Sequence, residues 1–151
     1  MSITRRVMNE INELVPINKK INITFEETCI TIIINNRTII LSPAYPFKSP
    51  DVFINNNKYT RFLYPPTNRI FKHMSELNIG CVCCSSIITK SINWVPTNTI
   101  QHVLDEVVRV NNIKMKVKYS IAIEEICLLI QRITRKSINI DRVFLEFLFD
   151  F

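Results

Sequence analysis

Apolar residues recur at spacings of three and four at the start of the chain. They form a stripe of Val7, Ile11, Leu14 and Val15, with polar residues at most positions between them. Such a stripe is typical of an amphipathic helix with one buried face. Pro16 follows directly and cannot continue a helix. The pattern therefore predicts a first helix over residues 3–15.

The pattern changes to β-branched residues over residues 21–41. Three runs, INITFEE, TCITIII and TIIL, are rich in residues that favour strands. Asn35 and Asn36 separate the last two runs, and asparagine tolerates the positive φ of a tight hairpin turn. A fourth run, DVFI, follows a loop in which prolines prevent regular strand pairing. We therefore expect four antiparallel strands.

Residues 59–94 show no long periodic pattern, and a loop of this size inside a compact domain is usually functional. The segment NTIQHVLDEVVRVNN then begins with residues able to cap a helix. Its apolar face consists of Ile100, Val103, Leu104, Val107 and Val108, and the first four form the stripe. We expect this helix to lie across the sheet with the stripe facing the strands. The segments IAIEEICLLIQRIT and DRVFLEFLF predict two further helices.

These elements predict an α+β fold, with an N-terminal helix, a four-stranded antiparallel sheet, a long loop, a central helix across the sheet and C-terminal helices. The 151 residues fit one domain, because domains cluster around about 100 to 150 residues. We therefore expect a single domain over residues 1–151.

Composition excludes several classes of function. The chain has one glycine, whereas phosphate-binding loops need several residues without Cβ. No apolar run approaches the ~18 residues of a membrane span, and Glu10 and Glu13 interrupt the start where a signal peptide needs an apolar core. We expect a soluble cytoplasmic protein without a membrane partner.

Abundant Ile and Asn are typical of an AT-rich genome, such as that of a protist or a large DNA virus. A viral source would place the protein in the host cytoplasm.

The charge and the cysteines add two expectations. The net charge is +6, but the Lys and Arg residues are scattered along the chain, so we expect no specific nucleic-acid site. Five cysteines are an odd number and come without a secretory signal. Free thiols in a reducing compartment are therefore expected.

Three segments, in order, resemble the ubiquitin-conjugating enzyme family. YPFKSPDV at residues 45–52 is similar to that family's Tyr-Pro-Phe-Lys-Pro-Pro-x-Val, and WVPTNTI at residues 94–100 is similar to Trp-Ser-Pro-x-x-Thr-Ile. The cysteines of residues 81–84 lie between them, where the family keeps its catalytic thiol. The family's His-Pro-Asn tripeptide is missing, but TNRIF at residues 67–71 resembles a motif of an atypical branch, Thr-x-Asn-Gly-Arg-Phe. The resemblance covers most of residues 3–110.

The resemblance implies an enzyme that needs no cofactor. It would receive ubiquitin or a ubiquitin-like protein from a ubiquitin-activating enzyme, hold it as a cysteine thioester, and pass it to a lysine amine, in some cases with a ubiquitin ligase. A thiol suits this role because it ionises readily and forms a labile acyl bond. The alternative reading is a catalytically inactive member of the fold, or a related RWD-like domain, that serves as a binding or structural module, for example of a virus.

The resemblance also nominates site residues. The distance along the chain to Trp94 favours Cys83 as the acyl carrier, followed by Cys84 and then Cys81. Asn68 is the candidate donor that steadies the oxyanion. The candidate ligase-binding residues are Phe47, Pro96 and Thr97. We expect no metal, since C-x-C-C lacks the two-residue gap with which neighbouring thiolates span a tetrahedral zinc ion, even with His73 as a fourth ligand.

Overall fold

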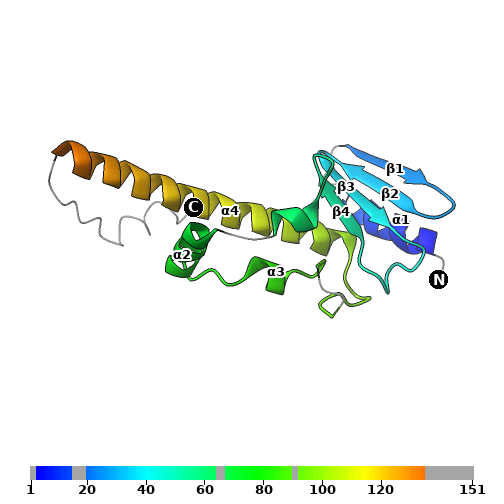
Figure 1. The fold of residues 1–151 in the computed structure, drawn as a ribbon. Helices are drawn as coiled ribbons and strands as arrows, with labels where there is room; N and C mark the ends of the chain where they lie inside the picture. The colour runs from blue at the N-terminus through cyan, green and yellow to red at the C-terminus, as the bar shows by residue number, and fades with distance from the viewer. Residues whose placement is uncertain (1–2, 15–19, 64–66, 90–91, 135–151) are drawn as a thin grey trace. The chain divides into compact units, whose positions relative to one another are not determined.

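The computed structural model describes residues 3–14, 20–63, 67–89 and 92–134. Their contacts group into two compact units, although we expected a single domain. The first unit contains Met1–Pro65 and Cys81–Val108, and the second contains Pro66–Gly80 and Arg109–Phe151. Each unit is described by itself. Figure 1 shows the elements along the chain.

The first helix, α1, spans Ile3–Leu14. Its apolar stripe is buried as expected, because Val7, Ile11 and Leu14 are each at most 2% exposed. Glu10 is buried on the same helix, so one side of α1 carries a carboxylate into the interior of the first unit. Val15, the last residue of the expected stripe, lies outside the described residues.

The sheet is antiparallel throughout, and its spatial order follows the chain. Its strands are β1 (Ile21–Phe25), β2 (Ile30–Ile34), β3 (Arg37–Leu41), β4 (Asp51–Ile54) and β5 (Asn57–Lys58). The first four confirm the predicted runs. The expected count of four is wrong, because β5 pairs with β4 after a turn in which Asn55 and Asn56 have φ values of 48° and 63°. A two-residue strand is too short to leave a period in the sequence.

One face of the sheet is buried. Ile32 pairs with Ile39, which in turn pairs with Val52, and all three are at most 2% exposed. Ile33 points to the opposite face and is 38% exposed. This alternation is the period of two that a half-buried strand requires. The hairpin between β2 and β3 turns at Asn35, whose φ is 57°, as its sequence predicts.

The segment without periodicity contains three short helical elements. They are η1 (Tyr59–Phe62), α2 (Asn68–Glu76) and α3 (Val82–Ser85). Thr67 caps α2 by accepting a hydrogen bond from the backbone N–H of Ile70. Two residues of α2, His73 and Met74, are buried. So short a buried stripe explains why the sequence pattern did not reveal this helix.

The last described helix, α4, runs without a break over Ile100–Thr134. The sequence predicted two separate helices here, which is wrong, because no Gly or Pro interrupts this stretch. The predicted stripe is buried, with Ile100, Val103, Leu104 and Val107 at most 5% exposed. Val108, expected on the same face, is 44% exposed and lies on the solvent side of the stripe. The third expected helix, DRVFLEFLF, lies outside the described residues.

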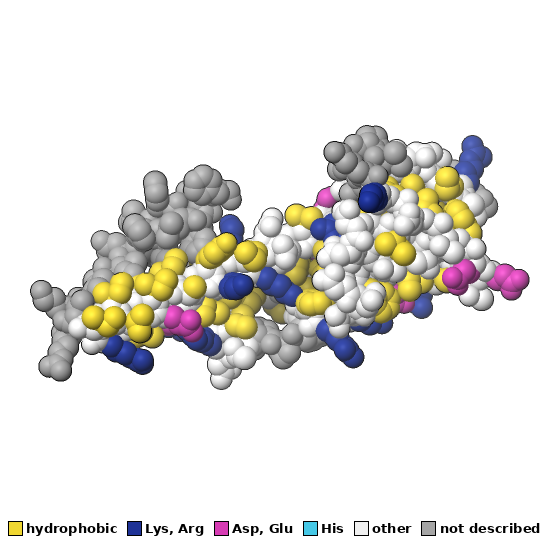
Figure 2. All heavy atoms as spheres, turned by 90° about the horizontal axis from the view of Figure 1, so that it is seen from above, with side chains coloured by type: hydrophobic (Ala, Val, Ile, Leu, Met, Phe, Trp, Pro, Cys, Tyr) yellow, Lys and Arg dark blue, Asp and Glu magenta, His cyan; other side chains and the backbone are white. Residues whose placement is uncertain are grey.

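The second half of α4 exposes apolar side chains, and Figure 2 shows them gathered toward the end of this helix. The most exposed are Ile126, Leu129 and Ile133, at 56%, 57% and 73%. None of the helices in the described part of the chain is long and apolar enough to cross a membrane.

Candidate functional site

Three thiols of the first unit converge around the single turn of α3. Cys81 caps this turn, and Cys83 and Cys84 lie within it. Their sulfur atoms all lie within 4.8 Å of one another. The Sγ atoms of Cys81 and Cys83 are 2.9 Å apart, and those of Cys83 and Cys84 are 3.9 Å apart. Cys81 and Cys84 are exposed, whereas Cys83 is half-buried.

Hydrogen bonding within this cluster shifts the pKa values of the two closest thiols, Cys81 and Cys83, in opposite directions. The thiols of Cys81 and Cys83 share a hydrogen bond, which is the main reason that the pKa of Cys81 is lowered to about 7. The same hydrogen bond, followed by burial, raises the pKa of Cys83 to about 11. Of this pair, the more exposed Cys81 therefore ionises before Cys83.

Neighbouring side chains fix the backbone of the cysteine turn. The Thr89 hydroxyl donates to the carbonyl oxygen of Cys83 at 2.9 Å. The Asn93 side-chain amide donates to the carbonyl oxygens of Cys84 and Ser86, at 3.0 and 2.9 Å. Since Asn93 directly precedes Trp94, it links the cysteines to the Trp-x-Pro segment.

A buried carboxylate on α4 anchors the residues that follow the cysteines. Glu106 is 5% exposed and accepts hydrogen bonds from the Ser86 hydroxyl at 2.6 Å, the Ile87 backbone N–H at 2.7 Å and the Tyr59 hydroxyl at 3.2 Å. Sequence reasoning missed this residue. The signal was available, because an acidic residue three positions after Val103 falls on the apolar side of the helix.

A second buried carboxylate, Glu10 of α1, joins the beginning of the chain to the first turn of α4. It accepts hydrogen bonds from the Tyr45 hydroxyl at 2.7 Å and the Ile100 backbone N–H at 2.9 Å. The Arg6 Nε pairs with its other oxygen at 2.8 Å. Burial, followed by the contact with Glu10, raises the pKa of Tyr45.

The Tyr-Pro and Trp-x-Pro segments meet directly. The indole N–H of Trp94 donates to the carbonyl oxygen of Pro46 at 2.7 Å, and the rings of Tyr45 and Trp94 are 6.1 Å apart. Arg6 adds a third connection, because its guanidinium donates to the carbonyl oxygen of Pro96 at 2.7 Å. The Tyr-Pro and Trp-x-Pro segments therefore form one hydrogen-bonded cluster with Arg6 within the first unit.

The predicted site residues fall in both units. Cys83 lies on α3, and Asn68 is the exposed first residue of α2 in the second unit. Phe47 is 80% exposed, and Pro96 and Thr97 are exposed as well. The hydrogen bond from Trp94 to Pro46 joins the loops that carry these three candidate ligase-binding residues.

The second unit contains a cluster of charges centred on Glu124 of α4. Lys72, His73 and Arg69 of α2 all contact this carboxylate, at 2.7, 3.1 and 3.1 Å. The hydrogen bond from Lys72 is the main reason that the pKa of Glu124 is lowered to about 2. The other ring nitrogen of His73, Nδ1, contacts Ser120 Oγ at 2.8 Å. Both nitrogens of this histidine therefore have partners within its own unit.

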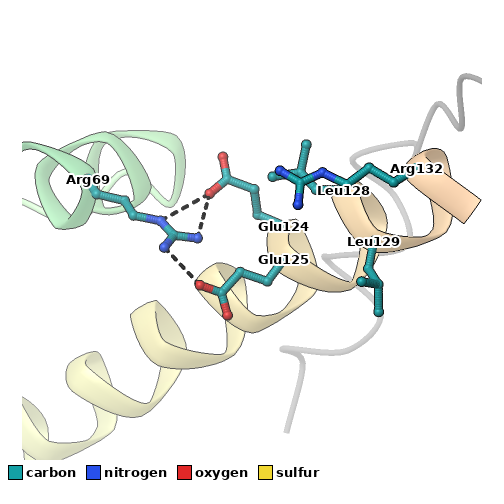
Figure 3. Close-up of a pocket in the computed structure, with 6 residues that line it drawn as sticks. All are labelled: Arg69, Glu124, Glu125, Leu128, Leu129 and Arg132. Atoms are coloured by element: carbon teal, nitrogen blue, oxygen red, sulfur yellow. Dashed lines mark hydrogen bonds and ion pairs between the residues drawn. The ribbon is translucent and has the colours of Figure 1, made fainter.

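An open pocket of about 410 Å³ lies beside these ion pairs. Figure 3 shows Arg69 reaching from α2 toward Glu124 and Glu125 of α4. The remaining lining residues are Leu128, Leu129 and Arg132.

No protein-family model, curated protein or solved structure matches the chain. The residues of the chain and their geometry therefore carry the functional proposal.

Proposed function

We propose that the chain is a divergent, compact ubiquitin-conjugating enzyme. It carries ubiquitin or a ubiquitin-like modifier as a thioester on Cys83 and passes it to a lysine amine. Its fold would then be a shortened form of the ubiquitin-conjugating-enzyme fold.

The observation that carries this proposal is the meeting of the Tyr-Pro and Trp-x-Pro segments. Tyr45 and Pro46 contact Trp94, and Arg6 contacts Pro96. A chance resemblance of separate short motifs would give no reason for their residues to bond to one another. Asn93 then ties this cluster to the backbone of the cysteine turn.

The chemistry of the turn is compatible with acyl transfer. In loading, Cys83 gives its proton to the ionised Cys81 sulfur 2.9 Å away. The Cys83 thiolate then attacks the carbonyl carbon of the incoming thioester, the bond to the activating enzyme's sulfur breaks, and that sulfur leaves as a thiolate. In transfer, a lysine amine attacks the new thioester, and the cysteine leaves as a thiolate while the amine loses a proton. The exposure of Cys81 and Cys84 at this turn supports access by a large substrate.

Phe47, Pro96 and Thr97 support a protein-binding role for the neighbouring surface. An aromatic side chain that is 80% exposed gains contact area when a partner covers it. We propose that a ubiquitin ligase binds these two joined loops.

The test is incubation of the full chain with ubiquitin-activating enzyme, ATP and ubiquitin, followed by a non-reducing gel. We expect a reductant-sensitive adduct that Cys83→Ala abolishes and that the control Cys127→Ala retains. Cys83→Ser should convert the adduct to an oxygen ester that resists thiol reductants. Loss of the adduct in Cys81→Ala with retention in Cys83→Ala would mean that the wrong thiol was chosen.

Asn68 provides a second readout. If its side-chain amide stabilises the oxyanion, Asn68→Ala should leave loading intact and slow transfer to lysine by about 10²-fold or more. Ser75→Ala, an exposed change on the same helix, is the matched control. Equal loss of loading and transfer in Asn68→Ala would contradict a catalytic role.

The half-buried state of Cys83 favours a second candidate, a non-catalytic binding module with the same fold. This module would form no adduct with any modifier, while variants of Phe47 would still lose binding to its partner.

A further inference from the structure

The cysteine turn holds more thiols than acyl transfer requires. One sulfur suffices to carry a thioester, yet three converge within 4.8 Å. A disulfide would engage two of them and leave the third without a role. Three converging sulfur atoms are instead the arrangement of a site for a thiophilic metal ion.

The spacing of the sulfur atoms can be compared with that of a metal site. At a metal–sulfur bond length of ~2.3 Å, three sulfur atoms in a plane around one ion are about 4.0 Å apart. The 3.9 Å between Cys83 and Cys84 already matches this distance. The 2.9 Å between Cys81 and Cys83 must open by about 1 Å. Rotation of the exposed Cys81 side chain can supply that movement, while Thr89 and Asn93 hold the backbone of the turn.

The number of ligands selects among the thiophilic ions. Among the described residues, no fourth His, Cys, Asp or Glu joins this group of three. Structural zinc is almost always bound by four protein ligands, whereas the soft monovalent ion Cu(I) is satisfied by three thiolates or fewer. The missing two-residue gap, which argues against tetrahedral zinc, is no obstacle to a three-coordinate ion.

We propose that Cys81, Cys83 and Cys84 form a three-thiolate site for Cu(I). On binding, each of the three sulfur atoms gives up its proton where it holds one and forms a bond to copper, and no electron is transferred because the ion is already Cu(I). This consequence rests on the acyl-transfer proposal: metal and thioester exclude each other on the Cys83 sulfur, so a copper-loaded chain accepts no modifier.

The test uses the full chain, reduced and kept anaerobic, with Cu(I) supplied in competition with the chelator bathocuproine disulfonate. We expect one Cu(I) per chain and protection of three of the five thiols from Ellman's reagent. Loss of an outer partner of a metal ligand already weakens binding by about 10- to 100-fold. Cys81→Ser and Cys84→Ser should therefore each weaken binding by at least about 100-fold.

Cys127→Ser is the matched control, since it removes a thiol outside the cluster and should leave the affinity unchanged. Far-ultraviolet circular dichroism of each variant shows whether it is folded. No competition with the chelator, equal affinity of Cys81→Ser, Cys84→Ser and wild type, or retention of Zn(II) against one equivalent of Cu(I) would each overturn the proposal. The measurement needs no ubiquitin, so its failure is distinct from failure of the acyl-transfer proposal.

Discussion

Replacement of Glu106 by alanine is expected to destabilise the first unit by about 3 to 5 kcal/mol, because it leaves two hydroxyls and one backbone N–H without their buried acceptor. Each hydrogen bond to a charged group contributes roughly 1.5 to 3 kcal/mol, and three donors end on this carboxylate. The three contributions are not fully additive, so the sum of their lower values is a better estimate than the sum of their upper values. Since whole domains are stable by about 5 to 15 kcal/mol, the loss is a large fraction of the total.

Glu106→Gln tests the effect of the charge alone, because glutamine has nearly the same shape as glutamate and no charge. Glutamine keeps one oxygen, which can accept from the backbone N–H of Ile87, the donor that has no freedom to turn away. Its NH₂ group can then donate to the hydroxyls of Ser86 and Tyr59, because a hydroxyl also accepts. The expected cost is about 1 to 2 kcal/mol, so stability should fall in the order wild type, glutamine, alanine.

The single tryptophan provides the assay. Trp94 is buried in the same unit as Glu106, so its fluorescence follows the unfolding of that unit in urea at pH 7. The control is Asp105→Ala, which removes an exposed hydrogen bond from Gln101 and should change stability by at most about 0.5 kcal/mol. The reasoning fails if Glu106→Ala unfolds at the wild-type urea concentration, or if the glutamine variant is the less stable of the two.

Two further changes test the other carboxylates. The pKa of Glu124 is lowered from 4.5 to about 2, so its contribution is complete above pH 4.5 and is lost as the pH falls toward about 2. The difference in Tm between wild type and Glu124→Gln, measured by circular dichroism, should shrink over this range, and a constant difference would contradict the ion-pair account. Tyr45→Phe removes one donor from Glu10 and should cost about 1.5 to 3 kcal/mol in urea unfolding; a loss below about 0.5 kcal/mol, the usual range for surface changes, would show that this hydrogen bond is dispensable.

The sequence by itself predicted α1, the first four strands and the buried stripe at the start of α4. These features arise from neighbours within one or two turns, or within one strand, so their period can be read from the chain. The strand β5 and the unbroken length of α4 escaped the same reasoning. The first is too short to show a period, and the second crosses residues 111–120, where polar side chains weaken the stripe without ending the helix.

Only the tertiary structure decided how the site is held together. Glu10 meets the backbone of Ile100 across 90 positions, and Glu106 meets Tyr59 across 47. Contacts between such distant residues leave no local pattern, because each partner alone reads as an ordinary polar or aromatic residue. The cysteines lie at neighbouring positions, yet their spacing in the sequence did not reveal that their sulfur atoms point to one place. That convergence depends on the turn of α3, which Thr89 and Asn93 fix through hydrogen bonds to its backbone.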